Sequence, residues 1–311
     1  MNCDKKYDIL LTGGTGFFGK SILSMKQRGF LPEFRFAVLS REPELFCQRH
    51  PEFANFDDVT FFKGDIRDFS FPDREFDFIL HCAAPSTVET AEVYHDIIVN
   101  GTAHILDLAK NSKIKKMLYI SSGAVYSPDL LAADKIKEDF PCKPVSSYGK
   151  AKYAAEQLCL NSTVPVVIAR CFSFIGTYIL DKKHLAVSSF VNACLQDKSI
   201  EINGDGSPLR SYMGADELVL WLFKILLKGR CGEIYNVGSD REISVLELAK
   251  SIHRIFNSSK PIIVQNNTPR SDTLNCYVPD VTKCFNEFGL SVNTDLHNEI
   301  LKLVSVETKY E

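Results

Sequence analysis

The stretch Leu10–Lys20, LLTGGTGFFGK, decides the fold, because an apolar strand-like run enters a glycine turn there and leaves it as a helix. Three glycines lie three residues apart, a spacing that differs from the general G-x-G-x-x-G pattern. Glycine allows a tight turn, close approach of the backbone to a pyrophosphate, and close packing of a helix on a strand. The start of the helix would offer N–H groups and positive dipole to phosphates. We therefore predict a dinucleotide-binding turn formed by Gly13, Thr15, Gly16, Phe17, Phe18 and Gly19.

The segments around this turn alternate between strand-like and helical patterns. The apolar runs are YDILLTGG, EFRFAVLS, VTFFKGD, FDFILHCAA, KMLYISSGAVY and PVVIARCFSFIG. Continuous apolar runs separated by helices indicate parallel strands that are buried on both faces. We expect an α/β fold: a Rossmann-type doubly wound parallel sheet with a smaller C-terminal α/β substrate lobe. The expected domains are a dinucleotide-binding domain over 1–175, to which 231–240 returns, and a substrate-binding lobe over 176–311.

Composition restricts the partners. The chain has 311 residues, of which 45% are hydrophobic and 24% charged, with a net charge of −3 and no basic stripe. Neither nucleic acid nor a membrane is therefore expected as a partner. The most apolar run, Leu218–Leu227, is too short to span a bilayer and is interpreted as a core helix. The ten cysteines show no metal-ligand spacing, and the start lacks a signal-peptide pattern, so we expect no metal and a reducing cytoplasm.

The end of the second strand, VLSRE, bears on the choice of cofactor. An acidic residue there would favour NAD, because it accepts from the ribose hydroxyl. Ser40 and Arg41 stand there instead, and an arginine forks onto phosphate oxygens. We therefore expect NAD(P) with a preference for NADP, unless Arg41 is only a solvated charge at the start of a helix.

Two further motifs lie along the expected cofactor path. GDIRD follows the third strand, where Asp65, with Ile66 beside it, could accept from the adenine amino group. HCAAPS ends the fourth strand, where the small side chains of Ala83 and Ala84 would let the cofactor pass close to the backbone.

The pair Tyr148 and Lys152, in SSYGKAKY, is the candidate catalytic centre. Residues four apart on a helix lie on one face, and proline and serine just upstream predict the helix start. An ammonium beside a phenol favours the phenolate, so that Tyr148 could exchange a proton with a sugar oxygen during hydride transfer. Ser121 and Ser122 end the fifth strand, and either hydroxyl could bond the same oxygen.

These motifs together resemble the extended short-chain dehydrogenases/reductases of the NAD-dependent epimerase/dehydratase family, which act on nucleotide sugars. The matching pieces, in family order over almost the whole chain, are TGGTGFFG, GDIRD, HCAA, VNGTAHIL, SSGAVY, YGKAK, GDGSPLRSYMGADEL and YNVGS. The resemblance implies catalysis by Ser122, Tyr148 and Lys152, an active-site position for Asn100, and diphosphate contacts from Arg210 and Arg270. It also implies a homodimer.

Departures from the family pattern narrow the expected reaction. Family dehydratases carry an Asp-Glu pair after the catalytic Ser/Thr, where this chain has Gly123 and Ala124. Epimerase-reductases of the GDP-fucose synthase type place a cysteine at the position of Ala124 and a histidine near His184, which could face the sugar. Ser173 stands at the position of a family asparagine.

We therefore expect reduction of a 4-keto nucleotide sugar. A 4-epimerase with tightly bound NAD, and a non-catalytic NAD(P)-binding sensor, are the alternatives. The nucleotide, the sugar and the reacting carbon stay open.

Overall fold

A computed structural model describes residues 6–54, 56–72, 74–85, 87–127, 135–182, 184–265 and 276–307. The chain divides into two compact units. The first comprises residues 1–125, 146–170 and 219–235, and the second comprises residues 126–145, 171–218 and 236–311. The chain therefore passes between the units five times.

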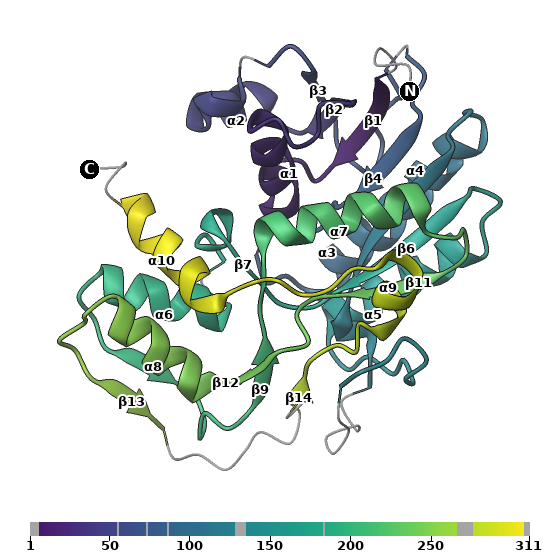
Figure 1. Ribbon diagram of the computed structural model, residues 1–311. Coiled ribbons are helices and arrows are strands. Elements are labelled where there is room, and N and C mark those ends of the chain that lie inside the picture. The colour runs from purple at the N-terminus through teal and green to yellow at the C-terminus, as the bar shows by residue number, and fades with distance from the viewer. Residues whose placement is uncertain are drawn as a thin grey trace. The chain divides into compact units, whose positions relative to one another are not determined.

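The first unit is built on a sheet of seven strands in the order β11-β6-β5-β4-β1-β2-β3. The pairings of β1 with β2 and β4, of β2 with β3, and of β4 with β5 are all parallel. The strands are β1 (Tyr7–Thr12), β2 (Phe34–Ser40), β3 (Val59–Lys63), β4 (Phe78–His81), β5 (Lys116–Ser122), β6 (Val166–Cys171) and β11 (Ile234–Val237). β11 lies in the segment expected to return to the sheet, and the predicted Rossmann-type fold is confirmed (Figure 1).

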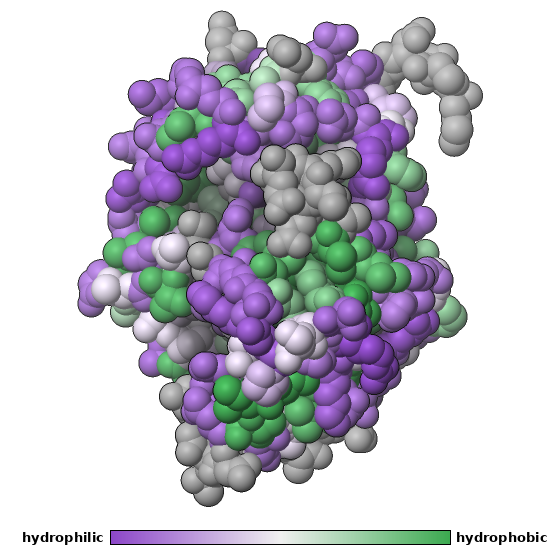
Figure 2. All heavy atoms as spheres, turned by 90° about the vertical axis from the view of Figure 1, so that its left-hand side faces the viewer, coloured by the Kyte–Doolittle hydropathy of each residue, from purple (hydrophilic) through white to green (hydrophobic). Residues whose placement is uncertain are grey.

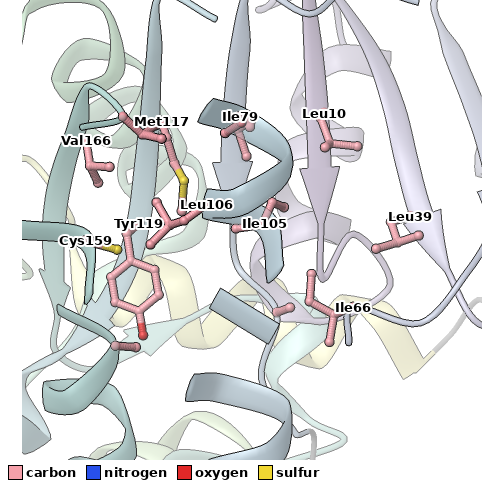
Figure 3. Packing of buried hydrophobic residues seen from close by; sticks show 14 of the residues in the cluster. Leu10, Leu39, Ile66, Ile79, Ile105, Leu106, Met117, Tyr119, Cys159 and Val166 are labelled. Carbon is pink, nitrogen blue, oxygen red and sulfur yellow. The ribbon is translucent and has the colours of Figure 1, made fainter. Parts of the chain in front are cut away.

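Alternation along β2 shows why both faces of the sheet are buried. Ala37 and Leu39 belong to a hydrophobic cluster that includes residues of the helices α4 and α5 (Figure 3). Phe34 and Phe36 instead meet Phe223 of α7, with ring centroids 4.8 and 6.2 Å apart. A strand buried on both faces needs apolar residues at successive positions, which is what the sequence supplies.

The connections of the first unit are mainly helical. They are α1 (Phe17–Gln27), α2 (Pro43–Arg49), the 3₁₀ turn Pro51–Phe53, α3 (Ala91–Tyr94), the π-helix His95–Asn100, α4 (Gly101–Lys110), the 3₁₀ turn Gly123–Val125, α5 (Ser147–Leu160) and α7 (Ala215–Lys228), whose first turn belongs to the second unit. The apolar run Leu218–Leu227 forms most of α7, in which Leu222, Ile225 and Leu226 are fully buried. It is a core helix, as predicted.

The second unit contains shorter strands, arranged as β10-β7, β12-β9-β14 and β13-β8. They are β7 (Phe174–Ile175), β8 (Ile200–Ile202), β9 (Leu209–Ser211), β10 (Met213–Gly214), β12 (Glu242–Ser244), β13 (Ile262–Val264) and β14 (Cys276–Tyr277). Its helices are the 3₁₀ turn Thr177–Ile179, α6 (Ala186–Leu195), α8 (Val245–Ile255), α9 (Thr282–Phe288) and α10 (Leu296–Glu307).

The surface mixes polar and apolar residues. Figure 2 shows hydrophilic and hydrophobic residues interspersed over one face. Within the described part of the chain, no helix combines the length and the apolar character that a bilayer crossing requires. The nine cysteines of these ranges form no disulfide with one another.

Candidate active site

The glycine turn between β1 and α1 is shaped by close backbone approaches. Gly13 has φ +70°, and a Cβ there would lie 2.6 Å from the carbonyl carbon of Cys82, just after β4. A Cβ on Gly19 would lie 2.2 Å from the Cα of Gly14, so α1 packs directly onto the turn. Gly14 is also confined, because a Cβ there would lie 2.3 Å from the side chain of Val38. Sequence reasoning did not single out Gly14, although the doublet after the strand was a visible signal.

Gly16 differs from these glycines, because the protein leaves space beside it. A Cβ at Gly16 would meet only the carbonyl oxygen of Gly13, at 3.4 Å, which is ordinary contact. Gly16 is the N-cap of α1, and the first turn, Phe17 to Gly19, contains no acidic residue. A helix start of this kind favours an anion, and a glycine there lets the anion reach the backbone. Thr15 is exposed, whereas Phe17 is buried and Phe18 half-buried.

The predicted adenosine end is assembled from the loops after β2 and β3. The hydroxyl of Ser40 accepts a hydrogen bond from the backbone N–H of Glu42, 3.2 Å away. Arg41 is exposed, and its charge acts on the carboxylate of Asp65. Asp65 is held by Arg67, whose Nε donates to Oδ1 at 2.8 Å, and this hydrogen bond lowers the pKa of the carboxyl.

Arg67, which the sequence did not single out, therefore competes for the carboxylate expected to meet adenine. Its second partner is Asp96 of the π-helix, at 2.7 Å.

The end of β4 and the start of α4 form the next part of the predicted cofactor path. Ala83 is buried and Ala84 half-buried, and Ile66 packs against Gly101, where a Cβ would lie 3.0 Å from its side chain. Asn100 is exposed at the end of the π-helix and donates to Asp96 Oδ1 at 3.2 Å.

The candidate catalytic residues lie on β5 and α5. Ser146 caps α5 by accepting from the backbone N–H of Gly149 at 3.0 Å, so the predicted helix start is confirmed. Lys152 is only 2% exposed, and its ammonium donates to the carbonyl of Ile120 on β5 at 2.8 Å. The same nitrogen lies 5.9 Å from the ring centroid of Tyr148. The structure thus brings Tyr148 and Lys152 together on one face of α5.

Ser122 ends β5, and its hydroxyl accepts from the backbone N–H of Ala124, at 3.2 Å. Gly123 and Ala124 follow in a 3₁₀ turn. The parallel strands β1, β4 and β5 end at the same edge of the sheet, so the glycine turn and Ser122 share that edge.

A buried histidine, absent from the sequence predictions as a site residue, connects these parts. His81 Nδ1 lies 2.6 Å from Thr12 Oγ1, and His81 Nε2 lies 3.0 Å from Thr102 Oγ1. Thr102 donates its single hydroxyl hydrogen to the carbonyl of Ile98, so it accepts from Nε2–H, and Nδ1 accepts from Thr12. Burial, with the nearby Lys152 charge, lowers the pKa of His81 to about 3. His81 is therefore neutral and joins β1 to α4.

Three predicted substrate residues belong to the second unit. The carbonyl of half-buried Ser173 accepts from Met213 N–H at 3.1 Å, and His184 is exposed. Arg210 donates to the carbonyl of Leu209 at 2.7 Å, its guanidinium lies 5.9 Å from the ring centroid of Tyr277, and burial lowers its pKa. Arg270 lies outside the described residues.

The residues present in the first unit fit a nicotinamide dinucleotide. The space beside Gly16 and the acid-free start of α1 suit its diphosphate. The hydroxyl of Ser121, 2% exposed on β5, has no hydrogen-bond partner within the described ranges, which leaves a buried polar group for a ligand to satisfy. No group of three or more His, Cys, Asp or Glu side chains gathers as a metal site in the part of the chain that the structure describes.

Comparisons with known proteins agree with this geometry. The model of the NAD dependent epimerase/dehydratase family matches residues 9–238. A dTDP-D-glucose 4,6-dehydratase of Dictyostelium discoideum is 29% identical over an alignment of 275 residues, and the match covers 79% of this chain and 62% of that protein. Its counterpart in Bos taurus is 28% identical over 268 residues, covering 81% and 73%. The chain thus spans less than two thirds of the Dictyostelium protein.

A solved structure shows the same fold. The UDP-glucuronic acid 4-epimerase of Bacillus cereus, in complex with UDP-glucuronic acid and NAD, superposes with a TM-score of 0.83 at 21% identity. The superposition covers 97% of this chain and all of the epimerase. Because the family match extends over most of the chain, the resemblance drawn from the motifs is confirmed. The protein belongs to the NAD-dependent epimerase/dehydratase family, within the extended short-chain dehydrogenases/reductases.

Proposed function

We propose that this protein is an NAD(P)-dependent oxidoreductase that reduces the 4-keto group of a nucleotide-activated sugar. The observation that carries the proposal is the arrangement at the end of β5: the buried ammonium of Lys152 donates to the Ile120 carbonyl and lies 5.9 Å from the ring centroid of Tyr148. That arrangement supports proton transfer by a phenol beside a fixed positive charge. The named activities of the curated relatives, which concern dTDP-glucose, support a nucleotide sugar as substrate.

The side chains divide the work as follows. Tyr148 gives its proton to the sugar oxygen as hydride reaches the carbonyl carbon, and regains a proton from solvent. Lys152 stabilises the phenolate and would hold the nicotinamide ribose. Ser122 hydrogen-bonds the reacting oxygen. The bound nicotinamide dinucleotide would supply the hydride.

The residues after Ser122 argue against dehydration. Gly123 and Ala124 stand where family dehydratases carry an Asp-Glu pair. Water loss needs a proton removed from carbon and a proton given to the leaving hydroxyl, and neither side chain can transfer one. Reduction needs only the proton of Tyr148.

NADP is the proposed cofactor. Arg41 is exposed, and the carboxylate of Asp65 contributes to its electrostatic surroundings. A 2′-phosphate near Ser40 would provide Arg41 with a bidentate partner, whereas a bare ribose would not.

Other side chains complete the proposed site. Asn100 shapes the active site, and Ser173 contacts substrate from a dinucleotide-binding domain over 1–175. His184, Arg210 and Arg270 contact substrate from a C-terminal lobe over 176–311. We propose further that the protein acts as a cytoplasmic homodimer.

A 4-epimerase is the second candidate. It uses the same three residues, and the solved structure with the same fold is a UDP-glucuronic acid 4-epimerase in complex with NAD. An epimerase would keep its cofactor and return the hydride to the other face of the sugar.

The deciding experiment incubates purified protein with NADPH and a panel of 4-keto-6-deoxy nucleotide sugars, and follows the absorbance of the reduced cofactor. Consumption that depends on the keto sugar supports the reductase. Interconversion of sugar epimers without added cofactor would replace it with the epimerase. Bound cofactor with neither activity would indicate a non-catalytic sensor and refute both.

The role of Tyr148 is tested by Tyr148→Phe. The variant keeps the aromatic ring but lacks the hydroxyl that donates the proton. We therefore expect turnover to disappear while cofactor binding, measured by fluorescence titration, persists. Unchanged turnover would exclude Tyr148 as the acid/base.

A further inference from the structure

The Lys152 ammonium lies close to a second aromatic ring, in addition to that of Tyr148. Its nitrogen is 5.0 Å from the ring centroid of Tyr119 on β5, compared with 5.9 Å for Tyr148. A cation within about 6 Å of a ring centroid is attracted by the negative face of the ring, and more strongly when water is excluded. Lys152 is 2% exposed and Tyr119 is fully buried, so this contact is desolvated.

The hydroxyl of Tyr119 does not explain why an aromatic residue stands there. Figure 3 shows the ring near Cys159 and Leu106, with the hydroxyl directed away from Met117. Within the described ranges the oxygen has no hydrogen-bond partner, and burial raises the pKa of the hydroxyl well above its ordinary value. A buried hydroxyl without a partner costs stability, so what the surroundings use is the ring.

We propose that Tyr119 is a positioning residue: its ring supports the buried Lys152 ammonium beside Tyr148 and favours its charged form. The effect on turnover rests on the proposed function. The support itself is a property of the protein without cofactor, and can be measured there.

The other titratable groups around Lys152 are largely neutral. On β4 and just after it, burial lowers the pKa of His81 to about 3 and raises the pKa of Cys82. On α5, burial raises the pKa of Cys159. None of these three side chains carries a charge near neutral pH.

A buried ion pair involves the same helix as Lys152. Glu156, one turn beyond Lys152 on α5, forms a bidentate ion pair with Arg170 of β6, at 3.0 and 2.8 Å. The guanidinium offsets part of the charge of the carboxylate, which also acts on the neighbouring Tyr119 and Cys159. The Ile120 carbonyl and the two rings are local groups that favour the ammonium.

The first experiment titrates Lys152 directly in the cofactor-free protein, from the NMR shift of its ¹³C-labelled side chain, assigned with Lys152→Arg. We expect Tyr119→Leu to lower the titration midpoint of Lys152 by about one pH unit, the size of a desolvated cation–π contact. Tyr119→Phe, which keeps the ring, should leave the midpoint in place.

A fluorinated ring provides the matched control for packing. Incorporating 3,4,5-trifluorophenylalanine at position 119 gives a ring of nearly the same shape as in Tyr119→Phe, but with less electron density on its face. The titration midpoint of Lys152 should therefore fall below the midpoint in Tyr119→Phe. This comparison decides the question even if Tyr119→Leu does not fold. Equal midpoints for the two rings would overturn the proposal.

The second experiment measures turnover against pH. The alkaline limb of kcat should move to lower pH in Tyr119→Leu by about the same amount, because the active form requires the Lys152 charge. Phe36→Leu removes a buried ring from β2 and should leave the limb unchanged. If the alkaline limb of kcat moves in both variants, the cause is a general loss of core packing, and the proposal is refuted.

The proposed function and this inference fail separately. If the Lys152 midpoint changes with the ring at position 119 but the protein turns over no nucleotide sugar, the proposed function is refuted and the positioning role of Tyr119 stands. If turnover depends on Tyr148 but the Lys152 midpoint does not change with that ring, the positioning role is refuted and the function stands.

Discussion

The buried ion pair between Glu156 and Arg170 gives the sharpest prediction about stability. Glu156 lies on α5, the helix that carries Tyr148 and Lys152, and its side chain is 0% exposed against 4% for that of Arg170. The two hydrogen bonds, at 3.0 and 2.8 Å, form the fork that holds α5 to β6. We expect Glu156→Gln to be strongly destabilising, because it leaves a buried guanidinium without its counter-charge.

The magnitude follows from that burial. Removing one partner of a buried pair costs about 3–5 kcal/mol. A domain is stable by only about 5–15 kcal/mol, so the variant loses a large share of its stability. Replacing both partners by apolar residues removes the stranded charge, so Glu156→Leu with Arg170→Met should recover most of the loss.

The assay is urea unfolding followed by the fluorescence of Trp221. This is the single tryptophan of the chain, 2% exposed on α7 within the first unit, so its emission reports on the unit that contains the pair. Asp107→Asn is the control, because the Asp107–Lys110 pair is exposed and its loss should leave the stability almost unchanged. A loss of unfolding free energy below about 1 kcal/mol in Glu156→Gln would refute the reasoning. So would a double variant, Glu156→Leu with Arg170→Met, whose loss equals the sum of the losses of its two single variants.

Three more predictions concern the glycine turn, the cofactor and pH. Gly16→Ala should weaken dinucleotide binding in a fluorescence titration without lowering the melting temperature, whereas Gly19→Ala, whose Cβ would meet Gly14 at 2.2 Å, should lower the melting temperature itself; equal effects on stability would contradict this difference. Arg41→Ala should raise the KM for NADPH several-fold and leave that for NADH unchanged, and a parallel rise would deny Arg41 a phosphate contact. Because the folded pKa of His81 is about 3 against an ordinary 6.5, its contribution to stability is present above pH 6.5 and is lost as pH falls towards 3. Between pH 6.5 and pH 4 the protein should therefore lose up to about 3 kcal/mol more than His81→Gln, and parallel pH curves in urea unfolding would disprove it.

The fold was predictable because its signals are local. Successive apolar residues in β2, such as Phe36 and Ala37, indicate a strand buried on both faces, whichever helices cover it. The glycines after β1 likewise indicate a tight turn from the local sequence alone. Tyr148 and Lys152 are four residues apart on one helix, so their meeting on one face required only helical geometry.

The missed features depend on contacts between distant segments. His81 joins Thr12 to Thr102 only because β4 lies beside β1 and α4 packs over that face. Tyr119 reaches Lys152 only through the packing of α5 on β5. One sequence gives strand patterns but neither strand order nor register, so no local signal distinguished these residues from ordinary core.

The five crossings of the chain between its units have a consequence for synthesis on the ribosome. The first unit is not complete until residue 235 has been made, because α7 and β11 come from the segment 219–235. Until Phe223 emerges, the rings of Phe34 and Phe36 lack their partner, and a growing chain exposes an apolar sheet face for close to two hundred residues of elongation. A nascent chain of this protein should therefore bind chaperones until α7 leaves the exit tunnel and be released soon afterwards.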